Sequence, residues 1–195
     1  MKKKLLTIIL IINFIISNSF AIEPDVFVQS TVNRASKLLS ENISKEKKIE
    51  ELKLIAKDTV DIRGIGFYTL GAARKNLSSE NKSRYILLFE KYFLKSFSSR
   101  LAEYTNPEIN VFGKKVLNEN YTIVNSTLKA TDERPEIKID WRIYTKNPEK
   151  PLIRDLIIEG LSLARTQKEE FLSVLNTNSG DINALFKTLE EFSNN

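Results

Sequence analysis

The sequence predicts an α+β domain in which helices from both ends of the chain enclose an antiparallel sheet of about four strands. Apolar residues recur every three or four positions up to about residue 104, a spacing typical of helices. After Pro107 apolar and polar residues alternate, as they do in strands, and the helical spacing returns after Leu163. Hairpin-length links join the strands, so we expect antiparallel pairing and one apolar sheet face.

The first 21 residues have the three-part pattern of a cleavable export signal. A basic start, Lys2–Lys4, precedes the largely apolar run Leu5–Ile16 and the small residues of Ser19-Phe20-Ala21. The apolar run is shorter than the ~20 residues that span a bilayer. We therefore expect residues 1–21 to be removed and residues 22–195 to form a single domain in the periplasm.

The composition excludes several classes of function. The chain has no Cys and no His, which removes disulfides, thiolate nucleophiles, Ser-His triads and the commonest metal ligands. The three lysines of the expected signal account for much of the formal net charge of +5, so the remaining domain is nearly neutral. A nearly neutral domain lacks the basic surface of a nucleic-acid-binding protein. We expect no metal, no cofactor and no nucleic-acid partner.

Two helices are expected to open the domain, each with a capping residue before an apolar stripe. Asp25 is a candidate cap for the first helix and Ser44 for the second. A shorter helix is then expected to end near Gly71. Its two close glycines, Gly64 and Gly66, do not form a nucleotide-binding loop, because the third glycine of that motif is replaced by Thr69 and no strand precedes it.

The next expected helix, starting after Ser78 or Ser79, carries an unusual number of aromatic residues on one stripe. They recur at helical spacing: Tyr85, Phe89, Tyr92, Phe93, Phe97 and Tyr104. Such a stripe usually packs a core. A ligand-binding wall would use the same residues, and the spacing does not distinguish the two.

The expected strands come next, and their alternation defines an apolar face. A short strand contains Ile109 and Val111, and the others fall within residues 121–126, 137–144 and 152–158. We assign four apolar residues of two neighbouring strands to one concave face: Ile123, Ile139, Trp141 and Ile143. Two further helices close the domain, the last of them capped by Asp181.

The segment Asp155–Leu163, which reads DLIIEGLSL, resembles the C-terminal signature of the MlaC family, also called toluene-tolerance proteins. In that family an Asp and a few apolar residues precede Glu-Gly-apolar-Ser-Leu, and a helix with an aromatic residue follows, here Phe171. Leu70-Gly71 and the aromatic helix match the order of elements, so the resemblance extends from about Phe27 to Phe186. The chain departs from the family in lacking a Trp just before the Asp and in having Thr-Gln-Lys at 166–168 where Asn-Tyr-Arg is common.

The resemblance implies a periplasmic phospholipid carrier without catalytic activity. Such carriers take lipid between an outer-membrane lipoprotein and porin complex and an inner-membrane ABC transporter with an MCE-domain ring, and so maintain outer-membrane lipid asymmetry. The implied fold is a twisted sheet wrapped by helices, with the lipid tails in an apolar pocket between them. The resemblance also implies a monomer. The candidate tail-binding residues are Phe67, Leu70, Phe89, Phe93, Phe97, Ile123, Ile139, Trp141, Ile143, Ile158 and Leu161.

Two other classes of function stay open at this point. A small isomerase or dehydratase on a similar sheet would use Asp140 or Asp155 as its base, because a lone carboxylate is sufficient for such chemistry. A protein-interaction adaptor would present the apolar sheet face to a partner. The plainer interpretation of the signature is structural, with Asp155 holding a turn, Gly160 allowing a bend and Ser162 capping the last helical region.

Overall fold

The computed structural model describes residues 21–132 and 134–194 and confirms the α+β class. Five antiparallel strands follow one another in chain order across one sheet: β1 (Ile109–Asn118), β2 (Tyr121–Leu128), β3 (Ile137–Tyr144), β4 (Leu152–Ile158) and β5 (Leu161–Ser162). The fifth strand, only two residues long, adds to the expected four. The expected export signal lies almost entirely outside the described residues.

Helices precede and follow the sheet, as expected. The N-terminal ones are α1 (Pro24–Ser40), α2 (Lys45–Thr59), α3 (Ile62–Thr69), the short 3₁₀ helix η1 (Gly71–Asn76) and α4 (Ser79–Leu101). The C-terminal ones are α5 (Leu163–Thr177) and α6 (Ile182–Asn194). None of the helices in the described ranges is both long enough and apolar enough to cross a bilayer.

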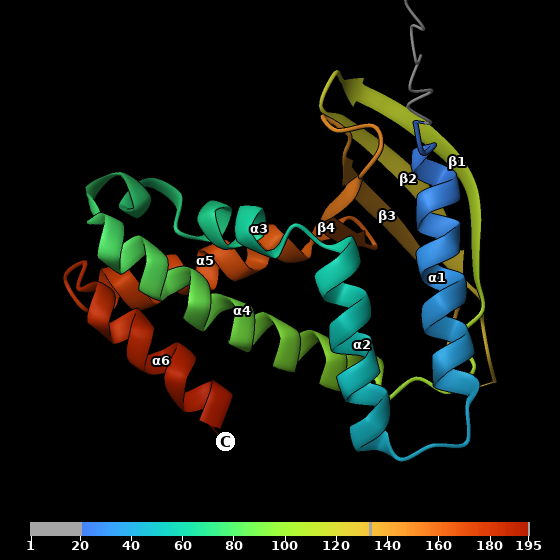
Figure 1. Cartoon of the computed structure of the whole chain (residues 1–195), viewed down its shortest axis with the longest axis horizontal. Coiled ribbons are helices and arrows are strands. Elements are labelled where there is room, and N and C mark those ends of the chain that lie inside the picture. The colour runs from blue at the N-terminus through green and yellow to red at the C-terminus, as the bar shows by residue number, and fades with distance from the viewer. Residues whose placement is uncertain (1–20, 133, 195) are drawn as a thin grey trace, which may run out of the picture.

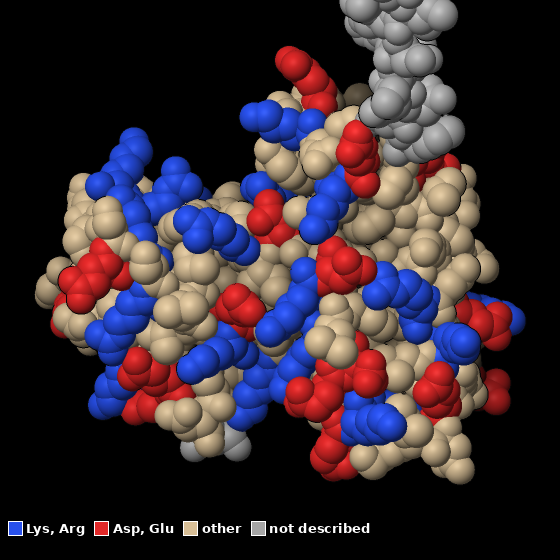
Figure 2. Space-filling model, in the orientation of Figure 1, with Lys and Arg blue, Asp and Glu red and all other residues tan. Residues whose placement is uncertain are grey.

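The elements form two groups that meet along α2 and β4. In Figure 1, α1 lies along the sheet near β1 and β2, while α3, α4, α5 and α6 pack together on the other side of the molecule. Contacts of α2 with α4, and of α5 and α3 with β4, connect the two groups. Figure 2 shows basic and acidic side chains mixed over the visible face, without a surface of one sign.

Serine caps fix the starts of three helices, as the sequence indicated. The hydroxyl oxygens of Ser44, Ser78 and Ser162 accept hydrogen bonds from the backbone N–H three residues on, which would otherwise be unpaired at a helix start. The expected cap at Asp25 is wrong, because α1 begins at Pro24 and Asp25 lies inside its first turn. Asp25 instead pairs with Lys114 of β1, 2.7 Å away, and fastens α1 to the sheet.

The predicted bend at Gly160 is a two-residue hairpin between β4 and β5. Glu159 and Gly160 both have positive φ, 49° and 83°, the combination that lets such a turn match the twist of the two strands. Ser162 then ends β5 and caps α5, so strand and helix follow one another without a loop. The signature segment thus sets the position at which α5 begins.

The strand register corrects one predicted side chain. Val124, not Ile123, lies opposite Trp141 in β3, whereas Ile123 pairs with Arg142. Successive residues of a strand point to opposite faces, so Ile123 lies on the outer face with Arg142, and Val124 lies on the inner face. The alternation was recognised correctly within each strand, but the register between β2 and β3 was one residue off.

Candidate functional site

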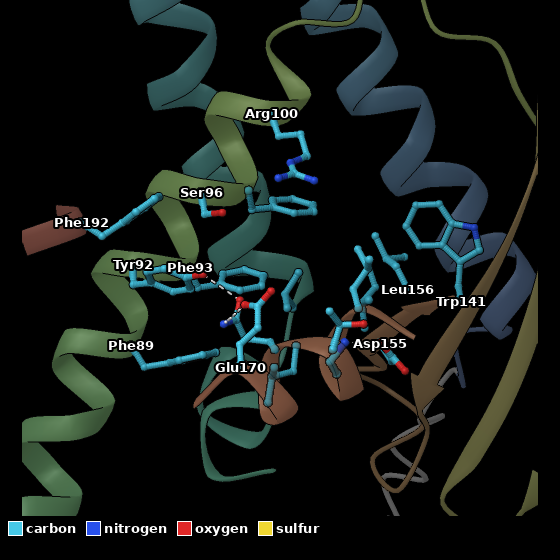
Figure 3. Close-up of a pocket in the computed structure, with 18 residues that line it drawn as sticks. Phe89, Tyr92, Phe93, Ser96, Arg100, Trp141, Asp155, Leu156, Glu170 and Phe192 are labelled. Carbon is cyan, nitrogen blue, oxygen red and sulfur yellow. Dashed lines mark hydrogen bonds between the residues drawn. The ribbon is translucent and has the colours of Figure 1, made fainter. Parts of the chain in front are cut away.

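The inner face of the sheet and the helices enclose a cavity of about 350 Å³ between α4, α5 and β4. We call it the α4–α5 cavity (Figure 3). Its apolar wall consists of Val60, Ile65, Phe89, Phe93, Phe97, Trp141, Ile153, Leu156, Leu163, Ala164 and Phe192. Tyr92, Ser96, Arg100, Asp155, Thr166, Gln167 and Glu170 complete the lining.

A second cavity of about 140 Å³ lies between α1, α2, the end of α4 and the sheet. We call it the α1–α2 cavity. No charged side chain of the described residues lines it. Its wall includes Val32, Leu39, Leu52, Ile55, Leu101, Leu128, Ile139 and Ile158, with Thr31, Ser36 and Thr59 as its small polar residues.

The two cavities are separated only by a few apolar side chains. Five residues line both of them: Val60, Phe97, Trp141, Ile153 and Leu156. Trp141 is held in this partition by a hydrogen bond from its indole Nε1–H to Ser126 Oγ, 2.9 Å away. The two apolar cavities thus lie side by side, one against α5 and the other against α1.

The aromatic residues of α4 form a continuous stack along the wall of the α4–α5 cavity. The ring centroids of Phe89 and Phe93 are 6.0 Å apart, and those of Phe93 and Phe97 are 5.4 Å apart and nearly parallel. Phe171 of α5 contacts Phe89 edge-on at 6.2 Å. These ring contacts fix the wall, because offset and edge-on aromatic pairs add stabilisation to the burial itself.

The polar side chains of Tyr92, Arg100, Gln167 and Glu170 form a polar rim where the α4–α5 cavity meets solvent. The exposed residues that line this cavity are Arg100, Leu163, Glu170 and Phe192, so the cavity opens between α4 and α5 beside the end of α6. Tyr92 donates a hydrogen bond to Gln167 Oε1 at 2.8 Å, and Gln167 Nε2 donates to Glu170 at 2.8 Å. Burial, and then the nearby Glu170 carboxylate, raise the pKa of Tyr92 above its ordinary value.

The comparisons with known proteins agree with this geometry. The model of the family described as MlaC protein matches residues 29–191. This chain belongs to the MlaC family. A solved phospholipid-binding protein from Ralstonia solanacearum, in complex with a phospholipid, is similar in fold, with a TM-score of 0.74 at 16% sequence identity; the match covers 88% of this chain and 97% of that one. No curated protein matches.

Within this MlaC-family fold, Asp155 of the signature is structural. Its carboxylate accepts a hydrogen bond from Ser162 Oγ at 2.6 Å and another from the backbone N–H of Ala164 at 3.0 Å. Arg142 lies 3.7 Å from the same carboxylate. Asp155 therefore reinforces the cap of α5.

The enzyme hypothesis gains no support from Asp140 either. Asp140 pairs across the strands with Asn125, which donates a hydrogen bond to its carboxylate at 2.7 Å. Both residues alternate with the core-facing side chains, so they lie on the outer face of the sheet, away from the cavities. No group of three or more acidic residues within the described ranges is arranged to hold a metal ion.

The structure brings six of the eleven predicted tail-binding residues to the cavities: Phe89, Phe93, Phe97, Ile139, Trp141 and Ile158. The other five lie elsewhere. Leu70 and Ile143 are completely buried away from either cavity, and Phe67 packs beneath the guanidinium groups of Arg63 and Arg74. Ile123 is on the outer face, and Leu161, next to the hairpin turn, is 59% exposed.

The sequence alone does not identify several wall residues. Ile153 and Leu156 of β4 line both cavities, whereas the sequence pattern places them only within a strand. A bulge opposite Arg142 and Ile143 lets both residues face inward although they are three positions apart, which simple alternation does not predict. Residues of α2, such as Leu52 and Ile55, had a visible inward periodicity, but nothing in it distinguished a cavity wall from a core.

Proposed function

We propose that this MlaC-family chain binds a phospholipid, with its acyl tails in the α4–α5 and α1–α2 cavities, and carries it between membranes in the periplasm. The observation that supports this most is the pair of apolar cavities that share one wall in a fold whose relative from Ralstonia solanacearum holds a phospholipid. Two adjoining cavities suit a molecule with two tails. The polar rim suits a headgroup that stays near water.

The energetics favour a wall of this kind for a lipid carrier. Two acyl chains of about 30 methylenes contribute roughly 24 kcal/mol of transfer free energy at ~0.8 kcal/mol each. A carrier must replace most of that stabilisation with its own apolar contacts. The aromatic stack of α4 and the partition around Trp141 supply such contacts on several sides of the cavities.

Family membership supports a proposal about the wider role. We infer that the chain exchanges lipid with an inner-membrane MCE-domain ABC transporter complex and an outer-membrane lipoprotein and porin complex, and that this exchange maintains outer-membrane lipid asymmetry. Binding and transport, not catalysis, is the function that the family supports. Export to the periplasm depends on the expected signal, and intact-mass measurement of the exported protein tests it, with a start at Ile22 as the expected result.

The experiment that tests the proposed function begins with protein purified without detergent or added lipid. Organic extraction followed by mass spectrometry should recover phospholipid in a fixed ratio to protein. The delipidated protein should then extract a fluorescent phospholipid from phosphatidylglycerol–phosphatidylethanolamine vesicles. A protein that neither co-purifies with phospholipid nor accepts it from vesicles would contradict the proposal and favour the adaptor hypothesis.

A further inference from the structure

The charged residues that line the two cavities are few. Among the described lining residues they are Arg100, Asp155 and Glu170, all in the α4–α5 cavity. Arg100, in the last turn of α4, is thus the single cation among them. Figure 3 shows Arg100 at one end of this space and Asp155 and Glu170 toward the other.

The two carboxylates already have hydrogen-bonding partners. Asp155 accepts from Ser162 and from the start of α5. Glu170 accepts from Gln167, whose amide oxygen is in turn bound by Tyr92. Neither carboxylate pairs with Arg100, which forms no ion pair or side-chain hydrogen bond with any residue that the structure describes.

Arg100 differs in this respect from most arginines of the domain. Arg34, Arg84, Arg142 and Arg154 each lie within ion-pair distance of a carboxylate. Others stack on aromatic rings, as Arg63 does on Phe67. Arg100 is positioned on a cavity wall, and none of the residues at 21–132 and 134–194 accepts a hydrogen bond from its guanidinium N–H donors.

A helix-end role does not account for this arrangement. A basic residue in the last turn interacts favourably with the helix dipole, and Arg100 is placed to do so. That interaction uses the charge but leaves the directional N–H donors unpaired. An anion that enters the rim from solvent would pair with both the charge and the donors.

We propose that Arg100 binds the phosphate of the phospholipid headgroup while the tails occupy the cavities. This inference rests on the proposed function and adds the group that orients the cargo. A phosphate carries charge that is costly to bury, so it remains at the rim. A guanidinium binds phosphate through two parallel N–H···O bonds, a geometry that a Lys does not reproduce.

The test compares one phospholipid with its neutral counterpart. Delipidated wild-type protein and the Arg100→Gln variant are titrated with dioctanoyl phosphatidylglycerol and with dioctanoylglycerol, which has the same tails and no phosphate. Fluorescence of Trp141, the one Trp in the chain, reports binding. Arg165→Gln is the matched control, because Arg165 is an exposed arginine near the start of α5 that does not line either cavity.

Arg100→Gln should bind phosphatidylglycerol about tenfold more weakly, the loss expected for a charge-assisted hydrogen-bonded pair at a partly exposed site. Its affinity for dioctanoylglycerol should be unchanged, and Arg165→Gln should behave as wild type with both lipids. Arg100→Lys should recover only part of the loss, because it keeps the charge without the bidentate geometry.

Each other outcome overturns the inference in a recognisable way. Equal weakening for both lipids would assign Arg100 a structural role, and unchanged phosphatidylglycerol binding would exclude it from the headgroup. Inorganic phosphate that binds wild type as tightly as the lipid does would indicate a site for free anions. Wild-type protein that binds neither lipid would contradict the proposed function itself.

Discussion

The two halves of α4 carry the same kind of aromatic stripe but serve different purposes. In the first half, Tyr85 and Leu88 are buried in a solid core. In the second half, Phe93 and Phe97 stay partly buried and face the cavities. Periodicity therefore identifies the apolar face of a helix, whereas the distance to the opposing elements decides whether that face closes into a core.

The difference arises from what lies opposite each half. Near Tyr85 the short helix α3 packs closely, and Thr69 forms a 2.7 Å hydrogen bond with the Tyr85 hydroxyl. Farther along, α4 faces α5 and the sheet across the α4–α5 cavity, and Trp141 and Leu156 line the opposite wall. Phe89, which is buried and also lines the α4–α5 cavity, marks the boundary.

The largest expected effect is the loss of stability when an aromatic side chain in the first half of α4 is truncated. Tyr85→Ala should lower the free energy of unfolding by about 3–5 kcal/mol, as large-to-small changes of buried aromatic residues do. Phe97→Ala should cost the lipid-free protein clearly less, because it enlarges an existing cavity and leaves no new void in a packed core. Denaturant unfolding of delipidated protein measures both, and equal losses would contradict the comparison.

A larger side chain should have different effects at a core position and at a cavity position of the sheet. Val124, which is completely buried and lines neither cavity, faces inward beside Trp141, while Ile139 lines the α1–α2 cavity. Val124→Trp should destabilise by about 1–3 kcal/mol through overpacking. Ile139→Trp should retain stability but reduce the phospholipid seen by native mass spectrometry. A similar drop in melting temperature for both variants would show that Ile139 lies in a solid core.

The hydroxyl of Tyr85 should make a smaller, pH-dependent contribution. Tyr85→Phe should cost about 1 kcal/mol at neutral pH by removing the hydrogen bond to Thr69. Burial raises the pKa of Tyr85 well above its ordinary value near 10. The contribution of the protonated Tyr85 hydroxyl to the free energy of unfolding is complete below about pH 10. It is lost as the pH rises toward the pKa of the folded state. Wild type should thus lose unfolding free energy above about pH 10 more steeply than Tyr85→Phe, and parallel curves would contradict this.

The smallest expected effect comes from the outer sheet face. Ile123→Thr should leave phospholipid binding unchanged, because Ile123 faces away from both cavities. Leu156→Thr, on the wall that both cavities share, should weaken binding measurably. Trp141 fluorescence titrations with short-chain phospholipid compare the two, and a loss of affinity in Ile123→Thr would contradict the register described above.

The contrast within α4 also explains what was predictable from the sequence. The helices, the antiparallel sheet and the caps at Ser44 and Ser162 follow from local spacing and hydrogen-bonding chemistry, so they were predicted correctly. The placement of Ile123 was wrong because strand register depends on partners in a neighbouring strand. Ile153 was missed because a bulge in β4 changes its facing, and such an irregularity leaves no signature in the alternation of side chains.

The most direct test of the account uses Trp141, the one Trp of the chain, which stands in the partition between the two cavities. Delipidated protein is loaded with phospholipids that carry bromine at defined positions along one acyl chain. Bromine quenches indole fluorescence on contact, so tails that occupy the cavities should quench Trp141 strongly and with a dependence on bromine position. Stoichiometric binding of the brominated lipid with undiminished Trp141 fluorescence would place the tails elsewhere and contradict the account.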